Sequence, residues 1–363
     1  MGIKCGIVGL PNVGKSTLFN ALTNTEIPAE NYPFCTIDPN VGVVRVPDAK
    51  LEAISRIVQP QHTIPAVVEF LDIAGLVQGA SEGEGLGNQF LAHIRETDAI
   101  AQVVRCFASD DVVHVSGQLN PIDDIETVNT ELLLADLETV QRNFEKAARQ
   151  AKTNEKEALN WCDLLKRVLT ELEDGRPVRN IKLQAHEIKS LETLQLITAK
   201  PLMYVANVGE TELKNNSYRD LVLSFADSEE IPVVTICATF EAALVQLPPE
   251  EQGAFLSEFG LEKPGLDRVV QTTYGLLNLQ TFYTTGSKEV RAWTVRRGTS
   301  AHEASGEIHT DFQRGFIRAE VTPVGTFIAR NGEQGAKAAG ETRLEGKDYL
   351  VTEGDVIHFH FNV

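Results

Sequence analysis

Residues 9–17 read Gly-Leu-Pro-Asn-Val-Gly-Lys-Ser-Thr, and they stand between the apolar run 3–8 and a helix-like stretch at 18–22. A strand, a glycine-bearing loop and a helix in this order are typical of a phosphate-binding loop, whose backbone N–H groups close around a β-phosphate. In such a loop Lys15 reaches the β- and γ-phosphates, and the Ser16 hydroxyl ligates Mg²⁺. The pattern predicts an α/β domain that binds a nucleoside triphosphate through Asn12, Val13, Gly14, Lys15, Ser16 and Thr17.

Two further segments follow in the order that a nucleotide-dependent switch requires. The polar segment 24–40 contains Thr36, whose hydroxyl could complete the Mg²⁺ shell when a γ-phosphate is present. The strand-like run 67–71 leads into Asp72, which could hold a water on Mg²⁺, and Gly75, whose N–H could contact the γ-phosphate. The predicted metal ligands are therefore Ser16, Thr36 and Asp72, and the predicted catalytic residues include Lys15, Thr36 and Gly75.

The predicted base-recognition loop departs from the pattern of guanine-binding proteins. After the strand-like run 202–206 the chain reads Asn207-Val208-Gly209-Glu210, where a guanine-binding protein has Asn-Lys-x-Asp. The Glu210 carboxylate is displaced by one methylene relative to that aspartate. A carboxylate there accepts a hydrogen bond from the ring N1–H of guanine, which adenine lacks. Discrimination by paired buried hydrogen bonds can reach several orders of magnitude, so this change could reverse the base preference. We expect Asn207, Val208 and Glu210 to contact the base, with both purines still open at this point.

A long segment with a single glycine separates the two halves of the predicted nucleotide domain. Between positions 117 and 209 the only glycine is Gly175, and apolar residues recur at three- and four-residue steps through 125–144 and 159–172. This periodicity predicts two long helices, with a third at 191–196. We therefore expect a helical, coiled-coil-like arm over 123–199, inserted between 1–122 and 200–277 of the nucleotide domain. Packing between the arm helices explains their apolar stripe more economically than a groove for a partner.

The C-terminal segment 278–363 has a different pattern. Four strand-like runs, with a short helix near 335–339 between the third and the fourth, predict a small mixed α/β module; the runs are 280–284, 289–295, 315–321 and 356–361. Arg291, Arg296 and Arg297 surround Trp293, a combination of cationic and stacking groups that could bind RNA but could equally be a solvated strand surface. The net charge of −18 argues against broad, non-specific nucleic-acid binding.

Together these motifs resemble the YchF subfamily of Obg-related P-loop NTPases over essentially the whole chain. The resemblance is carried by residues 9–17, 32–37, 72–76 and 207–210, and by C-terminal stretches that are similar to the TGS module of that subfamily. It implies a P-loop NTPase domain with an inserted arm and a C-terminal TGS domain of β-grasp fold. It also implies ATP as the preferred nucleotide, slow intrinsic hydrolysis, and association with the ribosome, at its large subunit, or with RNA.

The residue that orients the attacking water is not evident. Leu76 follows Gly75 of the second predicted switch segment, at the position where many related GTPases carry a glutamine. A leucine side chain cannot orient water. His114, in a polar segment after the strand-like run 100–107, is the catalytic candidate to which the resemblance points, although an ordinary loop histidine fits its position nearly as well. Asn12 offers a different answer, because it could hold K⁺ beside the phosphates. We expect Mg²⁺ as the cofactor, with K⁺ as a second ion.

Other classes of protein fit this sequence less well. A GTPase with relaxed base selectivity stays open, whereas a metabolic P-loop kinase leaves the switch segments without a purpose. No apolar run approaches the length of a membrane span and no basic, signal-like segment begins the chain, so we expect a cytoplasmic protein with no membrane contact. The five cysteines form no Cys-x-x-Cys pair, which argues against a zinc ribbon or a disulfide scaffold. We favour a monomer.

Overall fold

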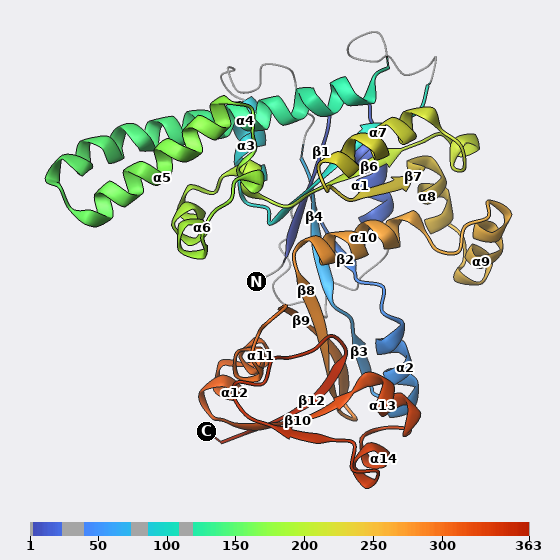
Figure 1. The fold of residues 1–363 in the computed structure, drawn as a ribbon. Coiled ribbons are helices and arrows are strands. Elements are labelled where there is room, and N and C mark those ends of the chain that lie inside the picture. The colour runs from blue at the N-terminus through green and yellow to red at the C-terminus, as the bar shows by residue number, and fades with distance from the viewer. Residues whose placement is uncertain (1–2, 24–39, 74–85, 109–118, 363) are drawn as a thin grey trace.

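The fold consists of two six-stranded sheets, with a helical arm that projects from the first of them (Figure 1). A computed structural model describes residues 3–23, 40–73, 86–108 and 119–362 of the chain. Within these ranges, no helix is both long enough and apolar enough to span a bilayer.

The first sheet has the strand order β2-β4-β1-β5-β6-β7, and only β2 runs antiparallel to its neighbour. Its strands are β1 (Lys4–Val8), β2 (Val41–Arg45), β4 (Val67–Asp72), β5 (Ala99–Arg105), β6 (Leu202–Asn207) and β7 (Val233–Ile236). The central strands β5 and β6 are buried along their whole length, as parallel strands covered on both faces must be. The carboxyl ends of β1 and β4 carry the predicted phosphate and metal residues.

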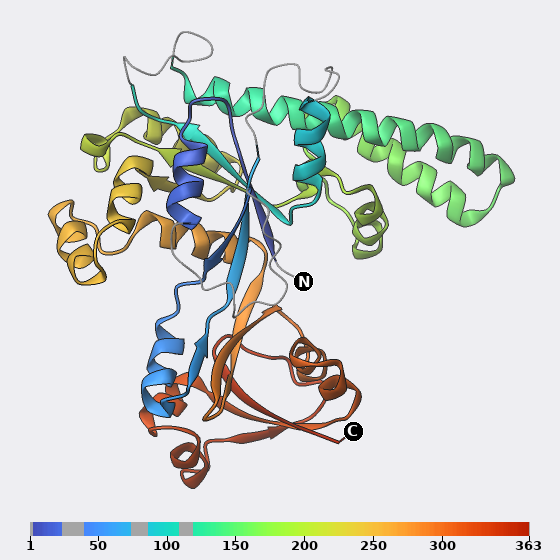
Figure 2. The same cartoon turned by 180° about the vertical axis from the view of Figure 1, so that it is seen from behind.

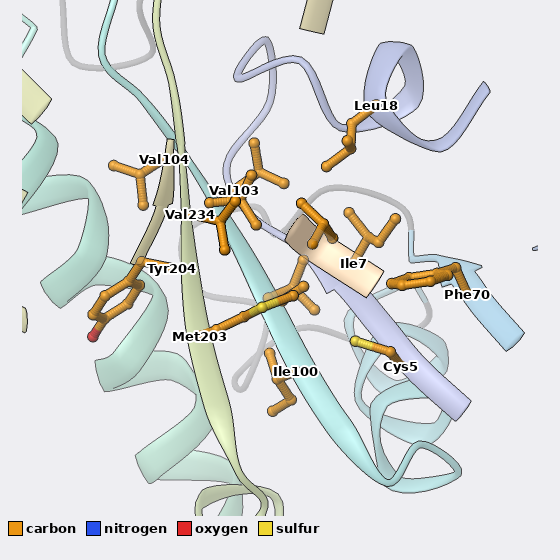
Figure 3. Packing of buried hydrophobic residues seen from close by; sticks show 14 of the residues in the cluster. Cys5, Ile7, Leu18, Phe70, Ile100, Val103, Val104, Met203, Tyr204 and Val234 are labelled. Atoms are coloured by element: carbon orange, nitrogen blue, oxygen red, sulfur yellow. The ribbon is translucent and has the colours of Figure 1, made fainter. Parts of the chain in front are cut away.

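Helices cover both faces of this sheet. They are α1 (Lys15–Thr23), α3 (Leu86–Arg95), α4 (Pro121–Gln150), α7 (Ser217–Ser228), α8 (Ala238–Val245) and α10 (Gly265–Leu276). Helix α9 (Pro249–Glu258) packs on α8, where the Phe255 and Phe240 rings are stacked. On one face Thr273 of α10 lies against Cys5. On the other, Asn129 of α4 and Phe225 of α7 contact Tyr204. Figure 3 shows Met203 and Tyr204, which are adjacent on β6, pointing to opposite faces of the sheet, as the period of two in a strand requires.

The arm is an antiparallel pair of helices, α4 and α5 (Lys156–Glu173), followed by α6 (Ala185–Leu191). The first half of α4 packs on the main core through Ile125, Val128 and Leu132, whereas the second half packs on α5 in a small core of its own. The two long helices predicted from periodicity are confirmed. The third helix was misplaced: it ends at Leu191, where we expected it to begin, because a Gln184/Glu187 capping box starts it earlier.

The second sheet has the order β11-β10-β12-β8-β9-β3 and is built mainly from the C-terminal segment. Its strands are β3 (His62–Ile64), β8 (Leu279–Thr285), β9 (Glu289–Arg296), β10 (Phe316–Pro323), β11 (Arg343–Glu345) and β12 (Asp355–Phe361). Its helices are α11 (Ala301–Ile308), α12 (Thr310–Arg314), α13 (Val324–Ala329) and α14 (Glu333–Ala338). The four predicted strands and the short helix, α14, are present, and α11, α12, α13 and β11 were not expected.

One strand of the second sheet comes from the N-terminal part of the chain. Strand β3 pairs in parallel with β9, from His62 opposite Glu289 to Ile64 opposite Arg291. Helix α2 (Ala49–Val58) precedes it and lies against the same C-terminal module (Figure 2). The range 1–122, which we expected to belong to the nucleotide domain, therefore contains a segment that completes the C-terminal sheet.

Candidate nucleotide site

The loop between β1 and α1 has a backbone that requires glycine at two positions. Gly9 has φ +150° and Gly14 has φ +95°, in the region that side chains rarely adopt. A Cβ on Gly9 would lie 2.6 Å from the Val103 carbonyl oxygen, and one on Gly14 would lie 2.3 Å from the Asn207 side chain. Asn12 is exposed and also has a positive φ, of 63°. The loop is thus shaped by close contact with β5 and β6.

Lys15 begins α1 and is buried within this loop. Its side chain is 7% exposed, and its ammonium donates a hydrogen bond to the Leu10 carbonyl at 2.7 Å. Burial lowers the pKa of Lys15 to about 8, and the nearby charge of Asp72 opposes that shift. A cation held out of water beside a phosphate-binding loop is a strong electrostatic partner for phosphate oxygens.

Ser16 and Asp72 bring together two of the three predicted metal ligands. The Ser16 hydroxyl donates to Asp72 Oδ2 at 3.2 Å, which joins the start of α1 to the end of β4. The other carboxylate oxygen, Oδ1, is buried and has no hydrogen-bond partner among the described residues. Hydroxyl and carboxylate oxygens suit Mg²⁺, which typically takes only one or two protein ligands and completes its shell with water and phosphate oxygens. The donor set therefore fits the ion.

Asn207 ties the phosphate loop to the base-side loop. The side chain is 4% exposed, and its Nδ2 donates to the Val13 carbonyl while its Oδ1 accepts from the Ala238 N–H, both at 2.9 Å. Val208 is buried and donates its N–H to the Ile236 carbonyl, whereas Glu210 is exposed in a single 3₁₀ turn. The three predicted base residues thus lie in one loop but in different environments.

Phe107 is a candidate that the sequence reasoning missed. It follows β5, is half-buried, and lies beside Gly209: a Cβ built there would be 3.8 Å from the Phe107 Cβ. The Arg105 guanidinium lies 4.7 Å from the Phe107 ring centroid, and its Nε donates to the Phe107 carbonyl at 3.0 Å. An aromatic residue directly after a buried strand was the signal that the sequence offered, whereas its position beside the base-side loop is seen only in the fold.

The remaining predicted site residues divide into two groups. Thr17 lies in the first turn of α1 and is half-buried. Thr36, Gly75 and His114 lie outside the described residues, as does Leu76. The described part of the site therefore contains the phosphate loop, one side of the metal site and the base-side loop.

We expect nucleotide binding to take up a proton in mildly alkaline solution. The Lys15 pKa of about 8 means that the ammonium is partly deprotonated above that pH, and the phosphates of a nucleotide favour the charged form. Affinity should therefore fall as pH rises above about 8, by up to about tenfold per unit. Calorimetry near pH 9 in two buffers of different ionisation enthalpy measures the uptake directly. Equal heats in both buffers would contradict it.

Two family models match the chain. One, YchF-GTPase_C, described as "Protein of unknown function (DUF933)", matches residues 279–362. The other, described as "50S ribosome-binding GTPase", matches residues 4–135. The two matches fall on the C-terminal module and on the phosphate-loop half of the first sheet.

Full-length relatives extend this similarity to the whole chain. The chain is 54% identical over 363 residues to "Ribosome-binding ATPase YchF" of Haemophilus influenzae, and 49% identical over 366 residues to the protein of that name from Bacillus subtilis; both alignments cover all of each chain. The solved structure of the Schizosaccharomyces pombe YchF GTPase superposes with a TM-score of 0.90 at 35% identity, covering 99% of this chain and 98% of the other. With its phosphate loop, inserted arm and C-terminal sheet, the chain belongs to the YchF family of P-loop NTPases.

Proposed function

We propose that the chain is a Mg²⁺-dependent ATPase switch that hydrolyses ATP slowly and whose nucleotide state controls binding to the ribosome, at its large subunit, or to RNA. The observation that carries the proposal is the convergence of Lys15, Ser16 and Asp72 at one edge of the sheet, beside a loop that Asn207 fixes to the base side. The ranges 1–122 and 200–277 bind the nucleotide, and 123–199 and 278–363 recognise the partner. The protein acts as a cytoplasmic monomer.

In this proposal the residues of the site divide the contacts with the phosphates and the metal ion among them. The N–H groups from Asn12 to Thr17 surround the β-phosphate, and Lys15 contacts the β- and γ-phosphates. Ser16 and Asp72, with Thr36, hold Mg²⁺, which neutralises charge developing on the transferred group. The Gly75 N–H contacts the γ-phosphate.

Three residues shape the base site in this proposal. Phe107 stacks on the purine face, and Val208 replaces the lysine of guanine-binding proteins with an apolar side chain. Glu210 is exposed, so its carboxylate stays hydrated instead of being held in place by buried partners. This arrangement does not reproduce the rigid carboxylate that selects guanine.

The water-orienting role remains with two candidates, since Leu76 cannot perform it. Either His114 orients the attacking water, or K⁺ held by Asn12 takes over part of the charge stabilisation. Both candidates would give slow hydrolysis without a partner, because neither reproduces the glutamine of faster enzymes.

The partner is proposed from the names of the relatives and from the basic surface of β9. The relatives are called ribosome-binding, and the Arg291 guanidinium lies 4.0 Å from the Trp293 ring centroid, with Trp293 Nε1 donating to Thr284. Arg296 and Arg297 are exposed at the end of the same strand. Stacked and cationic groups of this kind suit RNA.

Calorimetric titration with ATP and GTP in Mg²⁺ and K⁺, with phosphate release measured in parallel, tests the proposal. We expect ATP to be preferred by at least about tenfold, which is about 1.4 kcal/mol. A preference for GTP would overturn the ATPase assignment. It would favour instead a GTPase of relaxed specificity that acts as a nucleic-acid-binding translation factor. The family model that matches residues 4–135 is itself described as a GTPase.

A further inference from the structure

Residues 41–72, which we call the connector, form one continuous unit between the nucleotide site and the C-terminal sheet. At the nucleotide end, the Asp72 N–H donates to the Asn40 carbonyl at 3.0 Å. From there β2 and β4 pair without interruption, from Val41 opposite Leu71 to Arg45 opposite Val67. Two five-residue strands paired in this way span about 17 Å. One end of this strand pair therefore lies at Asp72, the candidate Mg²⁺ ligand, and the two strands lead away from it.

The far end of the connector is buried in the C-terminal module. Leu51, Ile54 and Ala66 share one core with residues of that module, which are Tyr283, Val290, Ala292, Phe327 and Val356. Strand β3 adds backbone hydrogen bonding by pairing with β9. Cores pack about as densely as organic crystals and do not deform freely. A shift of α2 must therefore be accompanied by a shift of β8 and β9.

Polar contacts fix the same junction. Asp48 caps α2 by accepting the N–H groups of Lys50 and Leu51, each at 3.0 Å. Its carboxylate also accepts from the Tyr283 hydroxyl, whose oxygen lies 2.8 and 3.0 Å from the two carboxylate oxygens. Tyr283 is 1% exposed. Lys50 in turn pairs with Glu353 at 3.1 Å. One carboxylate thus holds both the start of α2 and a tyrosine of β8.

The connector lies between the two predicted switch segments in the sequence. The first predicted switch segment ends at Asn40, where the connector begins, and the second begins at Asp72, where the connector ends. Both segments that would respond to a γ-phosphate are therefore joined to one strand pair. A module attached only by a flexible linker would not transmit their state, whereas a strand pair buried in a shared core does so.

We propose that the connector makes the C-terminal sheet part of the nucleotide switch, with Tyr283 as a positioning residue that acts through Asp48. The inference rests on the proposed function and specifies its regulation: nucleotide state alters α2 and β9, and with them the surface that carries Arg291 and Trp293. By reciprocity, a partner bound to that surface alters nucleotide affinity.

Hydrogen exchange of the full-length protein tests this proposal. Exchange is measured with Mg²⁺ and a non-hydrolysable ATP analogue, with ADP, and without nucleotide. We expect exchange rates in α2 and β9 to differ at least about twofold between the ATP analogue and ADP. Tyr283→Phe keeps the ring in the core and removes the hydroxyl contact with Asp48. It should reduce that difference and leave affinity for the ATP analogue unchanged.

Tyr349→Phe is the matched control, because the Tyr349 hydroxyl also donates to an aspartate, Asp355 at 2.7 Å, but outside the junction. This variant should keep the full nucleotide-dependent difference. Equal exchange in α2 and β9 in all nucleotide states, or the same loss in both variants, would overturn the inference. Calorimetry on the same samples separates the two claims, because a chain that binds no nucleotide overturns the proposed function and this inference with it.

Discussion

Replacing Lys15 by methionine should lower both nucleotide affinity and ATP turnover, the latter by at least about a hundredfold, or about 2.7 kcal/mol. The ammonium lies within the loop and is already desolvated, so its attraction to phosphate oxygens is weakly screened. The fold should not suffer. Methionine is apolar and of similar length. It removes the cost of burying a charge, which offsets the loss of the hydrogen bond to the Leu10 carbonyl, so the melting temperature should change little.

Calorimetry, phosphate release and thermal unfolding check these expectations together. Lys182→Met is the control. Lys182 is exposed in the segment between α5 and α6, and its replacement should leave all three measurements unchanged. Wild-type turnover in Lys15→Met would show that the loop does not bind the triphosphate as proposed. A large fall in melting temperature would contradict the account of Lys15 as a destabilising buried cation.

Replacing Asn207 by alanine should weaken ATP and GTP binding alike, by at least about tenfold. The change leaves the Val13 carbonyl and the Ala238 N–H buried without their side-chain partner, and each loss costs about 1–3 kcal/mol. The free energy of unfolding should fall for the same reason. Without Asn207 the phosphate loop and the base-side loop would no longer be held in one arrangement. Nucleotide binding must then order them, and this cost lowers the affinity.

Asp136→Ala separates this effect from general destabilisation. Asp136 is fully buried at the base of the arm and accepts from the N–H groups of Ile197 and Thr198, so its loss should destabilise the fold comparably. Its effect on nucleotide affinity should be small. If Asp136→Ala weakened nucleotide binding as much as Asn207→Ala, the specific role given to Asn207 would be wrong.

Local sequence patterns predicted much of the fold, because they were either periodic apolar residues or glycines that a backbone conformation requires. The phosphate loop needs glycine where φ is positive, and the helices of the arm have an apolar stripe along both lengths. Helix α11 escaped notice because it buries small residues such as Ala301 and Ala304. The Ser300/Glu303 capping box was the available signal.

The position of β3 could not be predicted from the sequence. Its three residues are exposed or half-buried, and its partner strand β9 lies in the distant C-terminal segment. Pairing between remote strands depends on how two modules meet, which no local periodicity records. The shared core around Tyr283 and Ile54 has the same origin, since neither residue is unusual in its own segment.

The candidate site was predicted in part for a similar reason. Motif spacing identified Lys15, Ser16, Asp72 and Asn207, and the structure places the first three within one small region. The two hydrogen bonds of Asn207 were not foreseen, because they join segments that meet only in the folded chain. Phe107 was missed because a single aromatic residue after a strand has no motif of its own.

Cosedimentation with ribosomes in different nucleotide states tests the central claim most directly. The account predicts that the protein is retained at least about tenfold more tightly with Mg²⁺ and a non-hydrolysable ATP analogue than with ADP, about 1.4 kcal/mol of coupling between two sites. Lys15→Met should lose this difference. Equal retention in both states, in a protein that calorimetry shows to bind both nucleotides, would contradict the account.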